Sequence, residues 1–368
     1  MMKKIAIVHE WLSTFGGTER LLIESRKLFP NADVFALTHF RKNFQNTALA
    51  EINTKTTFLQ NIPGIERHYR KLLPLMPFAI ESLNLSAYDL VISLSHAVAH
   101  GVRTHSQQTH VSYISTPMRY AWHMRDEYLN LHGLTNPLVR LAANGTLNLL
   151  RRWDISASVR SDSLIANSKW TGKHIHEAWN RTSEVIYPPV DVDRFSPAGE
   201  RDEYYLLVSR LVPYKMGIEI VKAFNVLGMP LVIVGDGPDL PAIRRIAREN
   251  IKLLGYQPDS VVTDLMNRAK AFVYMATEDF GIAMVEAQAA GCPVIAYGKG
   301  GATEIVLSEE TGLLFRDQTE AGMVEAVLRF ESMNYKEMVV PSATNAVRFS
   351  AERFRREFSS HIEKNLKS

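Results

Sequence analysis

The sequence predicts an α/β protein with two doubly wound, Rossmann-like domains, each built around a parallel sheet. The chain has 368 residues, which is more than one ordinary hydrophobic core accommodates. Short apolar runs alternate with segments of helical length, as in parallel sheets whose strands are joined by crossover helices. This alternation begins again after a proline-containing segment at residues 184–197, so we expect two domains.

The first half contains five apolar runs with the length and composition of buried strands. Each run is separated from the next by a segment long enough for a crossover helix. We expect strands at residues 3–11, 32–39, 88–98, 109–115 and 162–168.

The second half repeats the pattern, with strands and helices in strict alternation. We expect strands at residues 203–211, 230–238, 251–256, 271–279 and 293–301. The intervening segments have helical periodicity and predict helices at residues 217–227, 240–250, 260–270 and 281–291.

The segment EVIYPPVDVDRFSP, residues 184–197, is expected to connect the domains, because its prolines favour a stiff, extended backbone. We assign residues 1–187 to the first domain and residues 188–349 to the second. The amphipathic segment 350–368 predicts a final helix that crosses back to cover the first domain. In open α/β sheets ligands bind beyond the carboxyl ends of the strands, so we expect both sheets to face a shared central cleft.

The composition is that of a globular protein, with 46% hydrophobic and 22% charged residues. No apolar run reaches the roughly 18–20 residues of a membrane-spanning helix. The short run from Ile5 to Val8 favours a first strand over a signal peptide, so we expect a cytoplasmic protein. The single cysteine, Cys292, allows neither a disulfide framework nor a thiolate zinc site, and we interpret it as a small buried residue rather than a nucleophile.

Two glutamates, Glu278 and Glu286, flank the stretch Phe280-Gly281-Ile282-Ala283. Eight helical residues turn through about 800°, so the two acids would not share one helix face. We therefore expect Glu278 in a loop and Glu286 one or two turns inside the following helix. The free N–H groups at this helix start suit a diphosphate, and the carboxylates suit sugar hydroxyls. The alternative interpretation is one capping acid and one exposed acid.

A basic pair and two glycine turns also lie at predicted strand ends. Arg210 and Lys215 are five residues apart, so they can converge on phosphates from one loop, although such residues are often only surface charges. Gly16-Gly17 before a helix start is a plausible phosphate-contacting or sugar-contacting turn, and Gly235-Asp236 begins a second one.

The stretch EDFGIAMVEAQAAGCPVIAYGKGGATEIV, from Glu278 to Val306, resembles the E-x7-E signature of the family-4 retaining glycosyltransferases, which have the GT-B fold. The resemblance implies that Glu278 contacts the transferred sugar and Glu286 the nucleotide ribose. Arg210 and Lys215 match the R-x4-K element of that family, which implies that they stabilise the departing diphosphate.

Further segments carry the same resemblance. HEWLSTFGGTERLL is similar to a GG-x-E-R element that contains Gly16 and Gly17, and GDGP, residues 235–238, matches a turn that would line the base pocket. The sequence DVD at residues 191–193 looks like a metal-binding D-x-D, but this family has a similar connector without metal. We therefore expect neither a metal nor a cofactor, with a nucleotide sugar as co-substrate.

The segment HVSYISTPMRYAWHMRDEYL resembles a mannosyltransferase-like branch involved in bacterial polysaccharide biosynthesis. That branch often has a histidine just before Thr-Pro, where this chain has Ser115, and an acid where this chain has His123. These departures leave the donor sugar in doubt. His96 lies near the end of a predicted strand and either lines the site or is structural. Arg119 either meets an anionic acceptor or anchors its loop.

The resemblance implies transfer of a sugar, with GDP-mannose as the preferred donor and a UDP-sugar as the alternative. The expected acceptor is a polyprenyl-diphosphate-linked sugar or an oligosaccharide, within surface polysaccharide or lipopolysaccharide biosynthesis. Two other classes stay open: an epimerase of sugar nucleotides with a GT-B-like fold, and a non-catalytic sugar-nucleotide-binding protein.

The charge distribution bears on partners. Residues 1–187 have 21 Lys and Arg against 14 Asp and Glu, a net charge of +7, whereas residues 188–368 have 21 against 25, a net charge of −4. Basic, apolar segments at residues 67–80 and 138–153 fit peripheral contact with an anionic membrane, or equally a core-facing helix with snorkelling cations. The near-neutral total of +3 disfavours nucleic acid.

Overall fold

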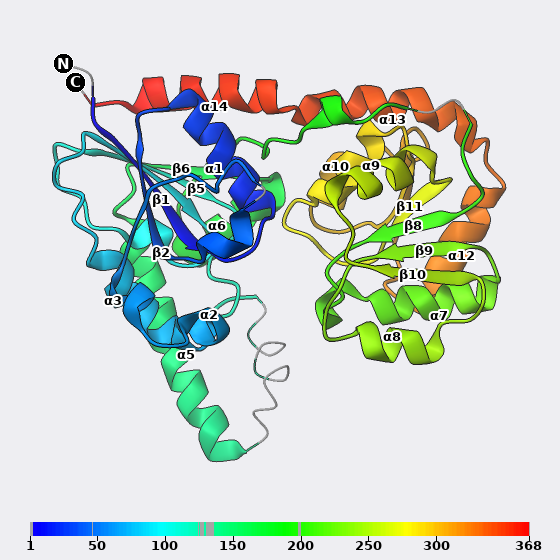
Figure 1. Ribbon diagram of the computed structural model, residues 1–368, viewed down its shortest axis with the longest axis horizontal. Coiled ribbons are helices and arrows are strands. Elements are labelled where there is room, and N and C mark those ends of the chain that lie inside the picture. The colour runs from blue at the N-terminus through cyan, green and yellow to red at the C-terminus, as the bar shows by residue number, and fades with distance from the viewer. Residues whose placement is uncertain are drawn as a thin grey trace. The chain divides into compact units, whose positions relative to one another are not determined.

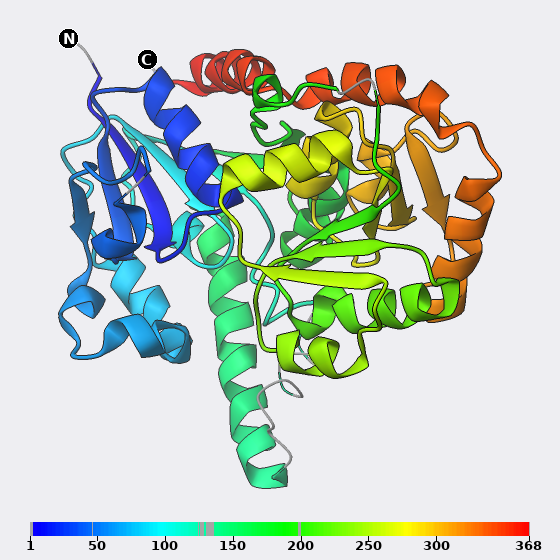
Figure 2. The ribbon, with the colours of Figure 1, turned by 45° about the vertical axis from the view of Figure 1, so that its right-hand side comes forward.

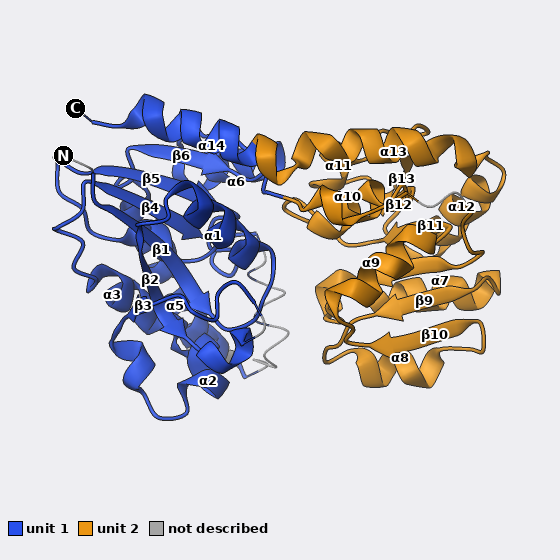
Figure 3. Cartoon of the chain, turned by 45° about the horizontal axis from the view of Figure 1, so that its top comes forward, with its two compact units in different colours: residues 1–189, 354–368 blue, residues 190–353 orange. Residues whose placement is uncertain are grey.

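The computed structural model describes residues 3–45, 47–123, 125, 129, 136–197 and 200–367. The chain divides into two compact units (Figure 3). Unit 1 comprises residues 1–189 and 354–368, and unit 2 comprises residues 190–353. Each unit is built on a parallel sheet, as the sequence predicts. The boundary drawn from the sequence, between residues 187 and 188, lies two residues before the division between the units.

In the described residues of unit 1, seven parallel strands form a sheet in the order β3-β2-β1-β4-β5-β6-β7. The five predicted strands are present. The two edge strands, of three and two residues, were not predicted because such short segments show no periodicity. The strands are β1 (Ile5–Leu12), β2 (Asp33–His39), β3 (Thr54–Thr56), β4 (Leu90–Ser95), β5 (Thr109–Ile114), β6 (Ser163–Ala166) and β7 (Glu184–Val185).

Helices cover both faces of this sheet, so successive strand residues point into two different cores. Ala6 and Val8 belong to one apolar cluster, and Ile7 belongs to the other. The α-helices of this unit are α1 (Gly17–Leu28), α2 (Ile65–His68), α3 (Met76–Glu81), α5 (Pro137–Ser158), α6 (Lys169–Trp179) and most of α14 (Ala351–Asn365) (Figure 1). The 3-10 helices are η1 (Arg41–Phe44), η2 (Phe58–Asn61), η3 (Tyr69–Leu75) and η4 (Ala99–Gly101).

The C-terminal helix α14 packs on the sheet of unit 1. Its buried apolar residues recur every four positions, at Phe354, Phe358 and Ile362, which places them on one helix face. They join the same cluster as Ile7, and both phenylalanine rings lie near Tyr113 of β5. The amphipathic pattern of this segment therefore reflects contact with unit 1.

Helix α5 is long for a domain of this size, with 22 residues. At 1.5 Å per residue it measures about 33 Å, and its amino-terminal part extends beyond the sheet (Figures 1 and 2). In the part of the chain that the structure describes, no helix is both long and apolar enough to span a bilayer.

In the described residues of unit 2, six parallel strands form a sheet in the order β10-β9-β8-β11-β12-β13. The strands are β8 (Tyr205–Val208), β9 (Leu231–Val234), β10 (Ile251–Gly255), β11 (Ala271–Tyr274), β12 (Val294–Tyr297) and β13 (Gly312–Phe315). The sequence predicts the first five. Strand β13, GLLF, was missed because it has no β-branched residue and starts with glycine.

The helices of unit 2 follow the predicted alternation and then continue toward α14. The α-helices are α7 (Gly217–Leu227), α8 (Leu240–Ile246), α9 (Asp259–Arg268), α10 (Ile282–Ala289), α11 (Ala302–Ile305), α12 (Glu320–Glu331) and α13 (Val339–Ala346). The 3-10 helices are η5 (Val192–Arg194), η6 (Pro213–Lys215), η7 (Tyr335–Met338) and η8 (Val347–Phe349).

Each sheet reverses its strand order once, between β1 and β4 in unit 1 and between β8 and β11 in unit 2. Loops leave such a reversal point in opposite directions, which opens a crevice beyond the carboxyl ends of the strands. The loops after these four strands are therefore the first places to look for a site.

Candidate functional site

Three polar side chains meet at the reversal point of unit 2. Lys215 ends η6 after β8, Tyr274 is the last residue of β11, and Glu278 lies in the loop between β11 and α10. The Lys215 Nζ donates to the Tyr274 hydroxyl at 3.1 Å. Both Lys215 and Tyr274 also donate to Oε1 of Glu278. The lysine and glutamate side chains are only 13% and 16% exposed.

Burial and charge together set the ionisation of this cluster. Burial acts to lower the pKa of Lys215, but the negative charge of Glu278, with smaller contributions from Tyr274 and Tyr214, raises the pKa above its ordinary value. Burial, followed by the charge of Glu278, raises the pKa of Tyr274. At neutral pH the cluster therefore holds an ammonium group and a neutral phenol beside one carboxylate.

Arg210, the other predicted cation, leaves the end of β8 on the same loop as Lys215. Its side chain is exposed, and Nη2 donates to the hydroxyl of Tyr214 at 2.7 Å. Lys215 thus lies against Glu278, whereas Arg210 is at the solvent side of the loop. Met216, which follows Lys215, adopts a left-handed conformation with φ of 57°, a region in which glycine is usual.

Glu286 is the fifth residue of α10, so it lies one turn inside the helix, and Glu278 lies in the preceding loop. This is the placement that the eight-residue spacing predicts. Glu286 accepts a hydrogen bond on Oε1 from Nη2 of Arg194 at 2.7 Å, and its side chain is 12% exposed.

The start of α10 is built by close backbone packing. Gly281 has φ of 109°, and a Cβ there would lie 2.2 Å from Cε of Met284. The Gly301 N–H donates to the Glu278 carbonyl at 2.8 Å, and a Cβ on Gly301 would lie 1.9 Å from the Phe280 carbonyl oxygen. Two glycines therefore fix the loop that carries Glu278.

The four residues Phe280, Gly281, Ile282 and Ala283 surround this helix start. The Phe280 ring is 3% exposed and packs against Phe349 at 5.4 Å between ring centroids. The Phe280 side chain therefore belongs to the core of unit 2. Ile282 and Ala283 begin the helix and are half-buried.

The turn at Gly235-Asp236 lies directly against the Arg210 loop. The Leu211 N–H donates to the Asp236 carbonyl at 2.9 Å. A Cβ on Gly235, whose φ is 139°, would lie 1.8 Å from the Ser209 carbonyl oxygen. Glycine is required for this approach, which places the exposed Asp236 beside the loop of the cations.

The predicted residues of unit 1 also follow strand ends. Gly16-Gly17 lead from β1 into α1, with Gly16 as its N-cap. His96 follows β4 and packs edge-on against Trp11 at 4.8 Å between centroids. Ser115 follows β5, and its N–H donates to the Ser95 carbonyl at 2.8 Å. Arg119 is half-buried four residues further on.

Residues 191–345 match the model of the family described as glycosyl transferases group 1. The matched segment lies within unit 2. The match covers nearly the whole of unit 2 and includes Lys215, Tyr274, Glu278 and Glu286, and it confirms the resemblance inferred from the sequence motifs.

Curated relatives with mannosyltransferase names support the same assignment. The chain is 33% identical over 197 residues to a GDP-mannose-dependent alpha-(1-6)-phosphatidylinositol monomannoside mannosyltransferase of Mycobacterium tuberculosis, covering 44% of this chain and 50% of the relative. It is 28% identical to the human GDP-Man:Man(3)GlcNAc(2)-PP-Dol alpha-1,2-mannosyltransferase, covering 56% and 49%. The chain thus spans about half the length of these relatives.

Solved structures agree with the fold over the whole chain. Sucrose-phosphate synthase from Thermosynechococcus elongatus has a TM-score of 0.74 at 18% identity, with 98% of both chains covered. Anabaena HepE in complex with UDP-glucose has a TM-score of 0.70 at 18% identity, with 98% and 99% covered. At this level of identity the likeness concerns the fold, and it confirms the predicted GT-B architecture of two parallel-sheet domains.

Two residues of the group 1 domain were missed by the sequence analysis. Tyr274 ends an apolar strand, where an aromatic residue is indistinguishable from core. Arg194 lies in the DVDRF segment, which attracted attention for its acids rather than its arginine. Asp191 and Asp193 themselves are exposed.

Unit 1 contains a third missed residue, Glu10 of β1, which is fully buried. Its Oε1 accepts from the backbone N–H groups of residues 96–99 at 2.8–3.1 Å and from Ser95 Oγ at 3.0 Å. This carboxylate therefore fixes the loop after β4 that carries His96. The sequence signal that could have identified Glu10 is an acidic residue inside an otherwise apolar strand.

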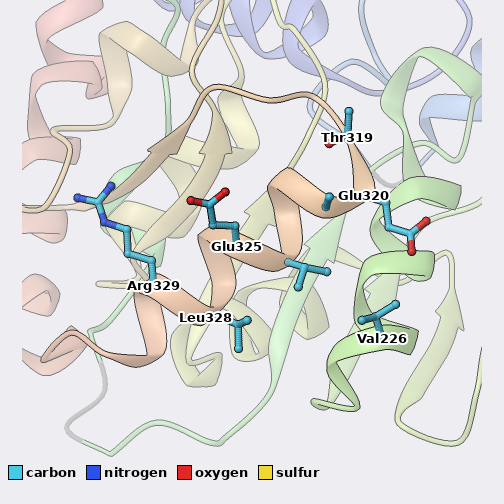
Figure 4. Close-up of a pocket in the computed structure, with 8 residues that line it drawn as sticks. Val226, Thr319, Glu320, Glu325, Leu328 and Arg329 are labelled. Atoms are coloured by element: carbon cyan, nitrogen blue, oxygen red, sulfur yellow. The ribbon is translucent and has the colours of Figure 1, made fainter.

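Unit 2 also has a shallow hollow between α7 and α12 that is separate from this cluster (Figure 4). Val226 of α7 and Leu328 of α12 contribute apolar surface, and Glu320, Glu325 and Arg329 contribute charge. The hollow includes none of the predicted site residues, so we assign it no role in the chemistry.

Proposed function

We propose that this chain is a retaining glycosyltransferase that transfers a sugar from a nucleotide sugar held by the group 1 domain. The observation that carries the proposal is the Lys215–Tyr274–Glu278 cluster at the point where the strand order of unit 2 reverses. Ligands of doubly wound sheets bind at this point, and the chemistry of the cluster matches a glycosyl diphosphate.

The side chains have complementary tasks in this proposal. The Lys215 ammonium group stabilises the negative charge that develops on the departing diphosphate, together with Arg210 and the N–H groups at the start of α10. The diphosphate competes with Glu278 for Lys215, which leaves the Glu278 carboxylate to accept hydrogen bonds from sugar hydroxyls. Glu286 accepts hydrogen bonds from the ribose.

The mechanism that we propose follows from the family resemblance. The acceptor hydroxyl attacks the anomeric carbon from the face that the diphosphate leaves, and the leaving phosphate oxygen takes the hydroxyl proton. No metal ion is required in this scheme, because the cations of the protein carry the charge stabilisation.

We propose GDP-mannose as the donor, because relatives that match part of this chain are named as enzymes that use GDP-mannose. A UDP-sugar is the alternative, and solved structures of the same fold contain UDP or UDP-glucose. The acceptor proposed is a lipid-linked sugar or an oligosaccharide, on the way to a surface polysaccharide or lipopolysaccharide.

A lipid-linked acceptor agrees with the exposed surface of α5 in unit 1. Leu141 and Leu149 are 69% and 66% exposed, and about 80° separates them around the helix. Arg151 and Arg152 are exposed on the same helix. We propose that this surface contacts an anionic membrane. Sedimentation with phosphatidylglycerol vesicles tests this: a Leu141→Gln, Leu149→Gln variant should bind less, and equal binding would contradict the contact.

The proposed activity is tested by screening nucleotide sugars for release of the nucleoside diphosphate in the presence of a polyprenyl-linked acceptor. Release from GDP-mannose is expected with the wild-type chain and should fall at least 100-fold in Lys215→Met and Glu278→Gln variants, since each removes an interaction with developing charge or with the sugar. Arg268→Gln is the matched control, because Arg268 forms an exposed ion pair with Asp202.

The same screen separates the alternatives. An epimerase would convert a sugar nucleotide into its isomer without an acceptor and without releasing nucleotide. A non-catalytic binder would bind the nucleotide sugar and leave it unchanged. Absence of turnover with every donor and acceptor tested would contradict the proposed transferase activity.

A further inference from the structure

Arg194 links the start of unit 2 to the acid proposed to bind ribose. It ends η5, and its guanidinium donates from Nη2 to Glu286 Oε1 at 2.7 Å and from Nη1 to Asp259 Oδ2 at 3.0 Å. The Arg194 side chain is 18% exposed and the Glu286 side chain is 12% exposed. All three residues belong to unit 2, so the arrangement is internal to one compact body.

We propose that Arg194 is a positioning residue that orients the carboxylate of Glu286 for recognition of the nucleotide ribose. The inference rests on the proposed function, because it concerns how the nucleotide-sugar site recognises the ribose hydroxyls. Arg194 acts through Glu286 and is not proposed to contact the reacting atoms.

The geometry of the guanidinium suits this task. A glutamate side chain has three rotatable bonds, so an unrestrained carboxylate samples many orientations. Arg194 restrains one carboxylate oxygen with a charge-assisted hydrogen bond. The guanidinium carbon lies 4.6 Å from the centre of the Phe195 ring, and that ring is 7% exposed, so the position of the guanidinium is itself restrained.

The other terminal nitrogen of the guanidinium, Nη1 of Arg194, is held by Asp259. Asp259 is the first residue of α9, and its side chain is 64% exposed. Because the guanidinium fork is planar, holding Nη1 at Asp259 fixes the direction in which Nη2 points. A lysine at this position has one ammonium group and would not hold both acids in the same way.

Charge gives a second reason for the pairing. The proposed ligand has a diphosphate close to Glu278 and Glu286, so two carboxylates would otherwise repel it. Arg194 offsets the charge of Glu286, as Lys215 offsets that of Glu278. Each acid of the pair thus has a cation of its own, and Arg194 pairs with Asp259 as well.

The test compares ligands that differ only in the ribose hydroxyls. Calorimetric titration measures the binding of GDP and 2′,3′-dideoxy-GDP, and in parallel of UDP and its dideoxy form. For the wild-type chain we expect the ribonucleotide to bind about 10- to 100-fold more tightly, the range for hydrogen bonds to a charged group. In Arg194→Gln this ratio should fall to about threefold or less. A purely structural role of Arg194 would weaken both ligands equally and leave the ratio unchanged.

Matched variants keep the result interpretable. Arg194→Lys retains the charge and should give an intermediate ratio, and Asp259→Asn should lower the ratio only two- to threefold because Nη2 stays on Glu286. Arg268→Gln, which removes an exposed arginine from the end of α9, should leave the ratio at the wild-type value. Should Arg194→Gln fail to fold, Arg194→Lys and Asp259→Asn decide the question by the same ratio.

The outcomes separate the inference from the proposed function. If the wild-type chain discriminates between the two ligands and the variants discriminate equally well, the role of Arg194 is overturned and the proposed function is not. A wild-type chain that binds both forms equally would overturn ribose recognition by Glu286, and this inference with it. Failure of the wild-type chain to bind GDP or UDP would overturn the proposed function as well.

Discussion

At the scale of single residues, Tyr274 connects the two charged groups of the candidate site, Lys215 and Glu278. Its hydroxyl accepts from Lys215 and donates to Glu278, so it contacts both charged side chains. The ring lies at the end of β11 and is 5% exposed, which means that the hydroxyl is delivered by a rigid strand rather than by a loop.

Removing this hydroxyl should affect turnover more than folding. In Tyr274→Phe the ring still packs, while Glu278 and Lys215 lose their common partner, so kcat should fall about tenfold and stability should change by about 1 kcal/mol. Steady-state nucleotide release and thermal unfolding measure the two effects. Tyr256→Phe, at a side chain that is 79% exposed, is the control. An unchanged kcat in Tyr274→Phe would contradict this role.

Buried histidines should make unit 1 sensitive to acid. Burial lowers the pKa of His110 from 6.5 to about 4. The unfolded chain takes up a proton as the pH falls below 6.5, whereas the folded chain does not until about pH 4, so falling pH favours unfolding within this window. Each such histidine contributes about 1.4 kcal/mol per pH unit.

Substitution of His110 should therefore reduce the pH dependence of stability. His110→Asn retains a hydrogen-bonding group near Ser93 Oγ, which lies 2.9 Å from the imidazole Nε2. Between pH 6 and pH 4.5, we expect the free energy of unfolding of the variant to fall less steeply with falling pH than that of the wild-type chain. The difference in slope should correspond to about one bound proton, and denaturant titration at each pH measures it. The same slope in the variant and the wild-type chain would show that His110 does not titrate in this way.

The sequence identified some residues of the candidate site and missed others. Glu278, Glu286, Arg210 and Lys215 were selected as candidates by their spacing and by a family resemblance, but the spacing gives no distances between loops. Only the structure shows that Lys215, rather than Arg210, lies against Glu278. Tyr274 was hidden because a strand-end aromatic residue has the same pattern as a core residue.

At the scale of elements, the loop before α10 depends on the glycines that follow β12. Gly300 pairs with Glu278 as an isolated parallel bridge, and Gly301 lies against the Phe280 carbonyl. The sequence placed both glycines at the end of an expected strand, and nothing in the pattern showed that they support the loop of the catalytic candidate. Long-range backbone packing of this kind has no periodic signal.

Gly301→Ala should therefore disturb both the fold of unit 2 and activity. The added Cβ would meet backbone at 1.9 Å, so the loop must move, with a cost of about 2 kcal/mol or more and loss of turnover. Gly145→Ala is the contrasting control, because a Cβ there meets nothing within 4 Å and α5 should gain about 0.5–1 kcal/mol. Chemical denaturation measures both, and equal effects would contradict the packing argument.

The strands that were not predicted from the sequence were missed for a common reason. Strands β3, β7 and β13 have three, two and four residues, and each lies at the edge of a sheet. Their strand geometry comes from pairing with a neighbour, since their own sequences lack an extended apolar run. The inner strands, by contrast, lie within apolar runs that are buried on both faces of the sheet, and they were predicted for that reason.

At the scale of the whole molecule, the C-terminal helix makes the first and last parts of the chain interdependent. Residues 354–368 belong to unit 1, so that unit is complete only when the chain has passed through unit 2. Phe354, Phe358 and Ile362 are at most 2% exposed. Burial of three large apolar side chains contributes about 5–9 kcal/mol, which is comparable with the stability of a domain.

Truncation after Arg353 should consequently unfold unit 1 and spare unit 2. Limited proteolysis of the truncated chain is expected to leave a resistant fragment corresponding to residues 190–353. Phe358→Ala in the full chain should lower the stability of unit 1 by about 3–5 kcal/mol, and Lys364→Ala, on the exposed side of α14, should have little effect. A resistant unit 1 in the truncated chain would contradict this dependence.

The central claim is that the carboxyl edge of β8 and β11 in unit 2 holds a nucleotide sugar. A crystal structure of the chain soaked with GDP-mannose tests it most directly. We predict the diphosphate within hydrogen-bonding distance of Lys215 and the ribose hydroxyls at Glu286. A nucleotide bound elsewhere, such as in the hollow between α7 and α12, with Lys215 still paired to Glu278, would contradict the account.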